Sequence, residues 1–483
     1  MKWHDWPSRG SASDGARARA DGRDAHTLRL VHRFDRPSSP ADVDAVLAYA
    51  ADRLTLDPVP LDGPLSAAEL VEETGVTITP GGLGTARALD VFADVLAPSC
   101  LSTDHPRYLS FIPCAPTQEA AAFDVVVGAS SIYGGSWLEG SGAVHAENEA
   151  LRWIAGLAGL PPTAGGAFVG GGTVGNLSAL VAARHTARDR AQANGTGIRP
   201  WRVAATYGAH SSIQAACDVM DAELVEVPAD DRWRLTGENL RRTLEEHDPS
   251  TFFAVVATAG TTNFGIIDDL ASVAEVCADL GIWFHVDGAY GGAALAAPSV
   301  RDRFAGVERA DSFIVDPHKW LFAPFDCCAL LYRDPALARA AHTQHAGYLD
   351  VLTEGPDWNP SDFAVGLTRR ARGLPLWFSL AVHGTDAYAR AVERTLEVAR
   401  FAEDEIRRRE HLELVRERDL SVMVFRRVGW GPADYREWSD RLLAEEFAFV
   451  VPTTHDGETV TRFAVVNPTT TEDDIRAILD TMI

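Results

Sequence analysis

Between about residues 150 and 335, short apolar strands alternate with amphipathic helices, and this alternation constrains the fold more than any other feature. Strands separated by helices pair in parallel through crossovers, and parallel strands are buried on both faces. The sequence therefore predicts an α/β fold with a mostly parallel sheet that helices cover on both sides. The segments, in order, are "WRVAAT", "HSSIQAACDVM", "ELVEV", "TGENLRRTLEEH", "TFFAVVATAG", "DDLASVAEVCADLG" and "IWFHVD".

The flanking regions have different patterns. The segment "SPADVDAVLAYAADRL" has a serine start and apolar residues at helical spacing, so we expect a helical N-terminal segment over 38–105. After residue 376 a long helical pattern is followed by the strand-like "SVMVFRRV" and "TRFAVV", which predicts a small α+β C-terminal domain over 377–483. Thr469 and Glu472 have capping-box spacing and predict the start of the last helix.

Composition limits the compartment and the partners. The 483 residues include 44 Lys and Arg against 68 Asp and Glu, and the net charge of −24 disfavours nucleic acid as a partner. No run approaches the ~18 apolar residues of a membrane span, and the N-terminus lacks the apolar core of a signal peptide. Residues 1–37 lack apolar periodicity and predict a flexible leader. The six cysteines show no CxxC spacing, which indicates reduced, buried thiols and a cytoplasmic protein.

Asp287 and Lys319 each follow an apolar strand, where open α/β sheets bind their ligands. Asp287 ends the strand in "IWFHVDGAYGGAA"; alternatively, an aspartate there caps a helix or a turn. Lys319 lies in the apolar stretch "VDPHKWLFAP", which predicts a lowered amine pKa, as Schiff-base formation needs. The alternative is a lysine that snorkels at the rim of the core.

Two further motifs are considered together with Asp287 and Lys319. In "GGAFVGGGTVGNLSALVAARHTA" glycines precede a helix that begins near Thr173, and such a helix start can bind phosphate or can be only a tight turn. His210 follows a strand, where its ring could stack on an aromatic cofactor or serve as a cap or core residue. Together, the four features are what pyridoxal 5′-phosphate (PLP) requires. No metal is expected, because no His/Cys/Asp cluster has ligand spacing.

With these motifs the chain resembles the group II PLP-dependent amino-acid decarboxylases, the family of aromatic-amino-acid and glutamate decarboxylases. The resemblance runs from about residue 100 to 480. It implies a fold-type I homodimer with active sites at the subunit interface and a PLP-binding large domain over 106–376 with a mostly parallel seven-stranded sheet. The motifs that carry it are "HPRYLSFIP", the glycine-rich turn, "GAHSSI", "ATAGTTNFG", "HVDGAYGG", "ADSFIVDPHKW" and "TRFAVVNPTT".

The resemblance also implies a role for single residues. Lys319 would form the Schiff base with the cofactor, with His318 beside it. Asp287 would pair with the pyridine nitrogen, so that the ring accepts electrons as the carboxylate leaves. His210 and Ala289 would pack on the two faces of the ring. The other cofactor contacts would be Gly172, Thr173 and Asp316 near the phosphate and Thr262 near the polar substituents of the ring.

The implied substrate contacts are apolar apart from one arginine. Phe111, Ile112 and Pro113 match the family's apolar substrate wall, and Arg462 matches an arginine that in some members reaches toward the cofactor and the substrate carboxylate. Because an acidic side chain would want a cation at this wall, an aromatic or aliphatic amino acid is favoured. We expect a decarboxylase that releases CO2 and an amine. A cofactor-free relative is another reading, against which the intact lysine and aspartate argue.

The segment between Tyr348 and Arg369 departs from the family pattern. Relatives carry there a mobile loop with a tyrosine that protonates Cα after the carboxylate has left. The only tyrosine here, Tyr348, precedes the loop, and the expected position falls near Asn359 or Pro360. His318 or a water would then deliver the proton. Otherwise the reaction would go elsewhere, as in family members that convert amino acids oxidatively to aldehydes with O2.

Overall fold

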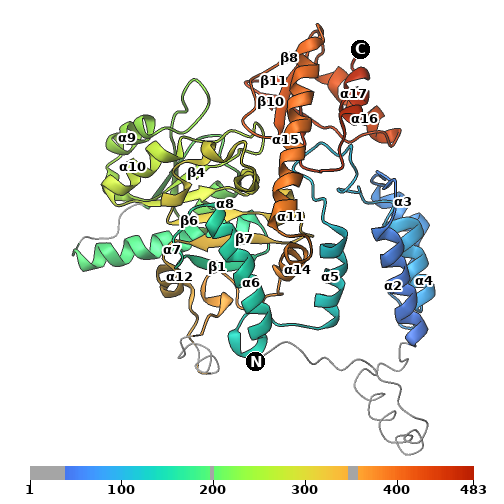
Figure 1. Ribbon diagram of the computed structural model, residues 1–483, viewed down its shortest axis with the longest axis horizontal. Coiled ribbons are helices and arrows are strands. Elements are labelled where there is room, and N and C mark those ends of the chain that lie inside the picture. Colours follow the sequence, from blue (N-terminus) through green and yellow to red (C-terminus); the bar gives the residue numbers. More distant parts are fainter. Residues whose placement is uncertain (1–38, 196–200, 346, 348–356) are drawn as a thin grey trace, which may run out of the picture. The chain divides into compact units, whose positions relative to one another are not determined.

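A computed structural model of the protein describes residues 39–195, 201–345, 347 and 357–483 (Figure 1). The expected leader and Tyr348 lie outside the described residues. Among the residues that are described, no helix is both long enough and apolar enough to cross a membrane. They divide into two compact units.

The smaller unit comprises residues 39–53 and 67–97 and is helical. Ser39 caps its first helix, because the backbone N–H of Asp42 donates to Ser39 Oγ at 3.2 Å and the Ser39 N–H donates to Asp42 Oδ2 at 2.7 Å. The helix predicted after Ser39 is thus confirmed. The helices are α2 (Pro40–Leu54), α3 (Ala67–Thr74) and α4 (Thr85–Val91), and α4 continues into the π-helical turn η1 (Phe92–Leu96).

The larger unit, residues 54–66 and 98–483, contains a seven-stranded sheet in the order β1-β7-β6-β5-β4-β2-β3. All strands are parallel except β7, which is antiparallel to both of its neighbours. The predicted mostly parallel sheet is therefore confirmed. The strands are β1 (Gly165–Val169), β2 (Arg202–Ala205), β3 (Glu223–Glu226), β4 (Phe252–Thr258), β5 (Trp283–Asp287), β6 (Ser312–Val315) and β7 (Cys328–Tyr332).

Helices cover both faces of this sheet, as the alternation of the sequence predicts (Figure 1). Val255 and Ala257 of β4 belong to the core shared with α6, α9 and α10, whereas Val256 between them belongs to the core shared with α7, α8 and α12. The helices of the first face are α6 (Trp137–Leu157), α9 (Gly237–Glu246) and α10 (Leu270–Leu280), and those of the second are α7 (Gly172–Ala193), α8 (Ser212–Met220) and α12 (Pro335–His342).

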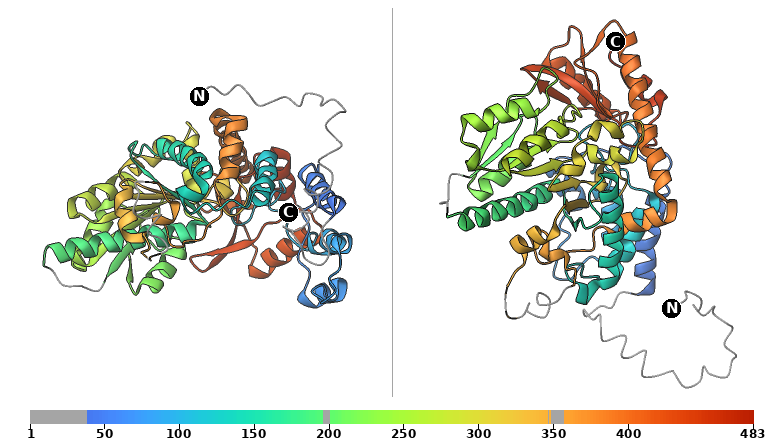
Figure 2. Two further views of the ribbon diagram at one scale, coloured as in Figure 1. Left: turned by 90° about the horizontal axis from the view of Figure 1, so that it is seen from below. Right: turned by 60° about the vertical axis from the view of Figure 1, so that its left-hand side comes forward.

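The C-terminal region contains a second, antiparallel sheet in the order β10-β11-β9-β8. Helix α15 (Thr385–Arg408) contacts this sheet, α17 and the segment after β5 (Figure 2). Its apolar face is buried around Phe425 and Phe463. The remaining elements are α5 (Gln118–Ala129), α11 (Pro317–Trp320), α14 (Leu374–His383), β8 (Leu412–Leu414), β9 (Val422–Arg427), α16 (Pro432–Ala444), β10 (Pro452–His455), β11 (Glu458–Ala464) and α17 (Glu472–Asp480).

The predicted start of the last helix is wrong by two residues. Thr471, not Thr469, caps α17: its Oγ1 accepts the N–H of Asp474 at 3.2 Å, and its own N–H donates to Asp474 Oδ2 at 2.9 Å. Thr469 instead hydrogen-bonds to Asn467, and Glu472 pairs with an arginine of α15. Each threonine is followed three residues later by an acidic residue, so the spacing alone does not show which threonine caps the helix.

The six cysteines form no disulfide. Burial of the thiols is confirmed for five of them and wrong for Cys100, which lies in a turn outside the core.

A buried ion pair joins α6 to the segment before α14. The guanidinium of Arg369 lies 2.8 and 3.2 Å from the two carboxylate oxygens of Glu147, and the N–H of Gly373 donates to Glu147 at 2.8 Å. Because both side chains are buried, removal of one charge leaves the other uncompensated.

We expect Glu147→Gln to lower the free energy of unfolding by about 3–5 kcal/mol, measured by chemical denaturation followed by circular dichroism. Asp279→Asn breaks an exposed ion pair, Arg241 to Asp279 at 2.6 Å, and should cost less than about 1 kcal/mol. Equal losses in the two variants would contradict the prediction.

Candidate active site

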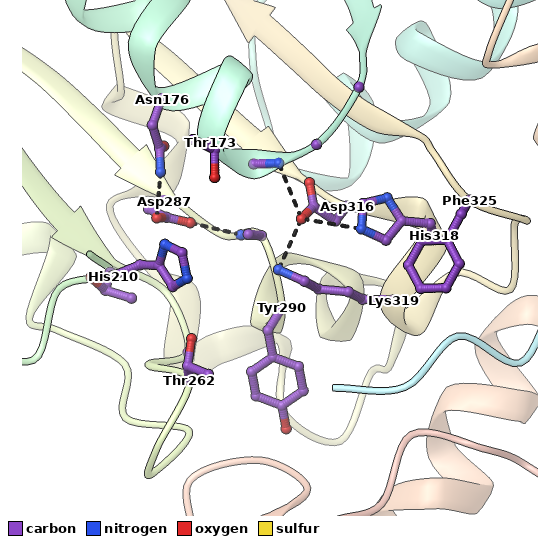
Figure 3. Close-up of a pocket in the computed structure, with 16 residues that line it drawn as sticks. Thr173, Asn176, His210, Thr262, Asp287, Tyr290, Asp316, His318, Lys319 and Phe325 are labelled. Carbon is purple, nitrogen blue, oxygen red and sulfur yellow. Dashed lines mark hydrogen bonds and ion pairs between the residues drawn. The ribbon is translucent and has the colours of Figure 1, made fainter. Parts of the chain in front are cut away.

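The carboxyl ends of β1, β4, β5 and β6 lie at one edge of the sheet, and the segments after them line a cavity of about 240 Å³ (Figure 3). This edge is where parallel α/β sheets bind ligands. The structure brings together every residue predicted for catalysis or cofactor binding. They are Gly172, Thr173, His210, Thr262, Asp287, Ala289, Asp316, His318 and Lys319.

The glycine-rich turn leads from β1 into the N-terminus of α7. The cap residue, Gly171, has a φ of 152° and offers no side chain to the first turn of the helix. At Gly172 a Cβ atom would lie 3.1 Å from Asp316 Oδ2 and 3.3 Å from the Cβ of Ala289, so a side chain would crowd the cavity. With the hydroxyl of Thr173 beside it, this helix start is a suitable anion site.

Lys319 lies on the short helix α11, which follows β6, and its Nζ is 2.9 Å from Asp316 Oδ2 (Figure 3). Burial lowers the pKa of the amine, but the charge of Asp316 and its hydrogen bond outweigh burial and raise the pKa above its usual value. The lowered pKa predicted from the apolar sequence around Lys319 is therefore wrong for this structure. The apolar stretch also contains a carboxylate one helical turn away.

His318 is the neighbour of this ion pair. Its Nδ1 is 2.7 Å from the carbonyl oxygen of Cys327, while its Nε2 faces the cavity, 3.7 Å from Asp316 Oδ2 (Figure 3). Burial lowers the pKa of the imidazole, although Asp316 opposes this effect. The ring of Phe325 packs against His318 at a centroid distance of 5.0 Å and also lines the cavity.

Asp287 ends β5 and is 4% exposed. Its Oδ2 accepts the side-chain N–H of Asn176 at 2.8 Å, and its Oδ1 accepts the backbone N–H of Ala289 at 3.0 Å (Figure 3). The sequence patterns did not single out Asn176. The available signal is its spacing, three residues after Thr173 and so on the same face of α7.

His210 extends into the cavity from the segment after β2 (Figure 3). Its Nδ1 accepts the backbone N–H of Ser212 at 3.2 Å and lies 2.9 Å from Ser212 Oγ. An Nδ1 that accepts leaves the proton of the neutral ring on Nε2.

The predicted substrate residues lie outside the lining of the cavity. Ile112 and Pro113 are buried, and Phe111 is 59% exposed. Arg462 donates from Nη1 to the carbonyl of Thr262 at 2.9 Å and from Nη2 to the carbonyl of Phe111 at 3.0 Å. It thus joins the apolar segment to the cavity, and the substrate roles stay predictions.

The position expected for the loop tyrosine is buried. Asn359 and Pro360 are both inaccessible, and Asn359 Oδ1 accepts the backbone N–H of Trp137 at 2.9 Å. Neither residue lines the cavity.

Comparison with known proteins identifies the family. A sequence model described as "Pyridoxal-dependent decarboxylase conserved domain" matches residues 86–428. The chain belongs to this family. It is 32% identical over 416 residues to L-2,4-diaminobutyrate decarboxylase of Rhizobium meliloti (strain 1021), covering 83% of this chain and 81% of the relative. It is 28% identical over 391 residues to aromatic-L-amino-acid decarboxylase of Bacillus atrophaeus, covering 78% and 80%.

The fold is shared with solved decarboxylases. The crystal structure of tryptophan decarboxylase of Oryza sativa with PLP and tryptamine superposes with a TM-score of 0.83 at 27% identity, over 93% of this chain and 99% of that chain. The chain is thus a PLP-dependent carboxy-lyase that acts on an amino acid, and PLP is its cofactor.

The residues of the cavity fit PLP, which supplies an aldehyde for a Schiff base and an electron-accepting ring when bound. The cavity offers an amine, a carboxylate and the open N-terminus of α7. Two of its buried polar atoms, Thr258 Oγ1 and Asp316 Oδ1, have no hydrogen-bond partner and are available to a ligand. Few side-chain amines could form the Schiff base with PLP, because the decarboxylase has only two lysines, Lys2 and Lys319.

Asp316→Asn should lower the pKa of Lys319, because it removes the opposite charge that raises it. In the cofactor-free decarboxylase, the pH of half-maximal labelling of Lys319 by an amine-reactive reagent should fall by about 1–3 pH units. Peptide mass spectrometry reads the labelling, and Lys2 in the same sample is the internal reference. An unchanged profile at Lys319 would refute the assignment of the raised pKa to Asp316.

Proposed function

We propose that this decarboxylase converts an L-amino acid with an aromatic or apolar side chain to its amine and CO2. The observation that carries the proposal is the meeting of Lys319, Asp287 and the N-terminus of α7 in one cavity. The apolar segment from Phe111 to Pro113, joined to this cavity through Arg462, supports the preference for an uncharged side chain.

Each group of the cavity has a part in this proposal. Lys319 binds the aldehyde carbon of PLP, and Asp287 holds a proton at the pyridine nitrogen, since two N–H donors fix its carboxylate. His210 packs on one face of the ring, and Ala289 on the other. The first N–H groups of α7, with the hydroxyl of Thr173, hold the phosphate.

Arg462 supplies the positive charge for the substrate carboxylate. Arg462 is 6% exposed, and burial lowers the pKa of its guanidinium to about 10. Within the described part of the chain its recorded partners are two carbonyl oxygens and no carboxylate. A buried cation with dipoles but no counter-ion is stabilised by an anionic ligand, which supports a carboxylate in its vicinity.

A second outcome, oxidative decarboxylation to an aldehyde, is favoured by one observation. At the position expected for the proton-donating tyrosine stand Asn359 and Pro360, both buried and neither an acid. If no group protonates Cα quickly after CO2 leaves, O2 can oxidise the substrate at this carbon instead; with one water, the other products are then the aldehyde, ammonia and hydrogen peroxide.

The products distinguish the two outcomes. We expect incubation with L-tryptophan, L-phenylalanine, L-leucine and L-glutamate to yield CO2 and amine from the aromatic or aliphatic substrates, without uptake of O2. Aldehyde with hydrogen peroxide would establish the second outcome instead. Turnover of L-glutamate alone would overturn the side-chain preference.

Borohydride reduction of the PLP-loaded protein should attach the cofactor to the peptide of Lys319 and not to that of Lys2. Lys319→Ala should lose this attachment and CO2 release together.

We also propose a homodimer. Helices α2 and α3 contain no buried residue, and apolar side chains such as Val43, Val46 and Leu47 are about half exposed. Exposed apolar groups of this kind are typical of surfaces that bury against a partner. We further propose a cytoplasmic location, because the six cysteines form no disulfide.

Light scattering should give a mass near twice the 52.1 kDa of one chain. Leu47→Asp should shift the protein toward the monomer, whereas Val428→Asp, at a comparably exposed valine next to β9, should not. A monomeric wild type would contradict the proposal.

A further inference from the structure

A buried chain of hydrogen bonds leads to Asp287 from behind the cavity. Trp283 Nε1 donates to Ser312 Oγ at 2.8 Å, and this oxygen lies 2.8 Å from His285 Nδ1. His285 Nε2 lies 2.8 Å from Asn176 Oδ1, and Asn176 Nδ2 donates to Asp287 Oδ2 at 2.8 Å. His285 is fully buried, and Asn176 is 1% exposed.

The partners fix the position of every proton in this chain. The carboxylate of Asp287 only accepts, so Asn176 Nδ2 donates to it and Asn176 Oδ1 is left to accept from His285 Nε2. In the neutral ring Nδ1 then accepts from Ser312 Oγ, which itself accepts the indole N–H of Trp283. The proton of the neutral imidazole therefore lies on Nε2 and is donated to Asn176 Oδ1. Burial lowers the pKa of His285 to about 4, although Asp287 opposes this effect, so the ring is neutral near pH 7.

The amide of Asn176 is thereby held in one orientation. Its oxygen accepts from His285, one hydrogen goes to Asp287 Oδ2, and the other goes to Ser212 Oγ at 2.9 Å. A reversed amide would place its oxygen against the carboxylate of Asp287 and its N–H groups against the N–H of His285, and would lose both of these bonds. The orientation of the donor that Asp287 receives thus depends on a histidine that does not line the cavity.

We propose that Asn176 and His285 are positioning residues, which aim the carboxylate of Asp287 at the pyridine nitrogen of PLP. The inference rests on the placement of that nitrogen proposed above. Asp287 has two N–H donors, one from the backbone and one from Asn176. Without the second donor Oδ2 is free to turn away, and the charge-assisted hydrogen bond to the ring loses its geometry.

The test compares PLP with an analogue that carries carbon in place of the ring nitrogen, by titration of the cofactor-free, full-length protein with tryptophan fluorescence as the signal. In His285→Leu and Asn176→Leu the affinity for PLP should fall about tenfold, as for loss of one hydrogen bond to a charged group. The affinity for the analogue, which has no nitrogen to pair, should stay at its wild-type value. A loss shared equally by PLP and the analogue, or no loss at all, would overturn the inference.

Two further variants separate positioning from general damage. His285→Gln places an amide N–H where it can donate to Asn176 Oδ1, and should restore the affinity for PLP; failure of this rescue would count against the hydrogen-bond chain. Thr186→Val is the matched control, because Thr186 is buried on the same helix and donates to the carbonyl of Ala182 at 2.9 Å. It should leave both affinities unchanged.

Asp287→Asn distinguishes failure of this inference from failure of the proposed site. This variant should lower the affinity for PLP and leave the affinity for the analogue unchanged. If it weakens both equally, the ring nitrogen does not face Asp287, and the proposed placement falls together with the inference. If Asp287→Asn lowers the affinity for PLP alone, and the two leucine variants do not, only the positioning role of Asn176 and His285 is overturned.

Discussion

The close packing of α7 across the centre of the parallel sheet is the constraint on which the site depends. A Cβ atom at Gly175 would lie 3.0 Å from both Cys328 Sγ and Ile314 Cγ2, so the helix approaches β6 and β7 more closely than a larger residue allows. This approach brings the first turn of α7 to the carboxyl ends of β5 and β6. The same turn then supplies an anion site at Gly172 and a donor for Asp287 at Asn176.

The N-terminus of α7 is in contact with the carboxylate of Asp316 and is also the proposed site of the phosphate of PLP. Asp316 Oδ2 accepts the N–H of Gly172 at 3.3 Å and pairs with Lys319, while the buried Oδ1 has no hydrogen-bond partner among the described residues. A phosphate at the N-terminus of α7 needs the same N–H groups, and an amine that attacks an aldehyde must first give up its proton. If PLP binds as proposed, it would displace Asp316 from Gly172 and end the ion pair of Asp316 with Lys319. The carboxylate of Asp316, which raises the pKa of Lys319, is thus also a group that the proposed phosphate would meet.

Local pattern predicts the fold and the four features that suggest PLP, whereas the other residues of the lining were implied by the family resemblance. The strands before Asp287 and Lys319 are apolar throughout, and their carboxyl ends share one edge of the sheet whatever the details of packing. The sequence does not predict the roles of Asn176 and His285, because each has the pattern of a core residue in its own element. Only the packing of α7 on β5 makes them hydrogen-bond partners. The pKa of Lys319 and the cap of α17 were missed for a related reason. Several local partners were possible, and the choice between them is made in three dimensions.

The charges at the cavity bear on the proposed preference for an uncharged substrate side chain. Among the described residues that line it, Lys319 is the lysine, and Asp287 and Asp316 are the carboxylates. Bound PLP would add a phosphate, and the guanidinium of Arg462, already bound to two carbonyls, is a further positive charge linked to the cavity through Thr262. In the proposed function the α-carboxylate of the amino acid pairs with this cation. An acidic side chain would need a second cation, and the segment from Phe111 to Pro113 offers only apolar groups, which is the physical reason for proposing an uncharged side chain.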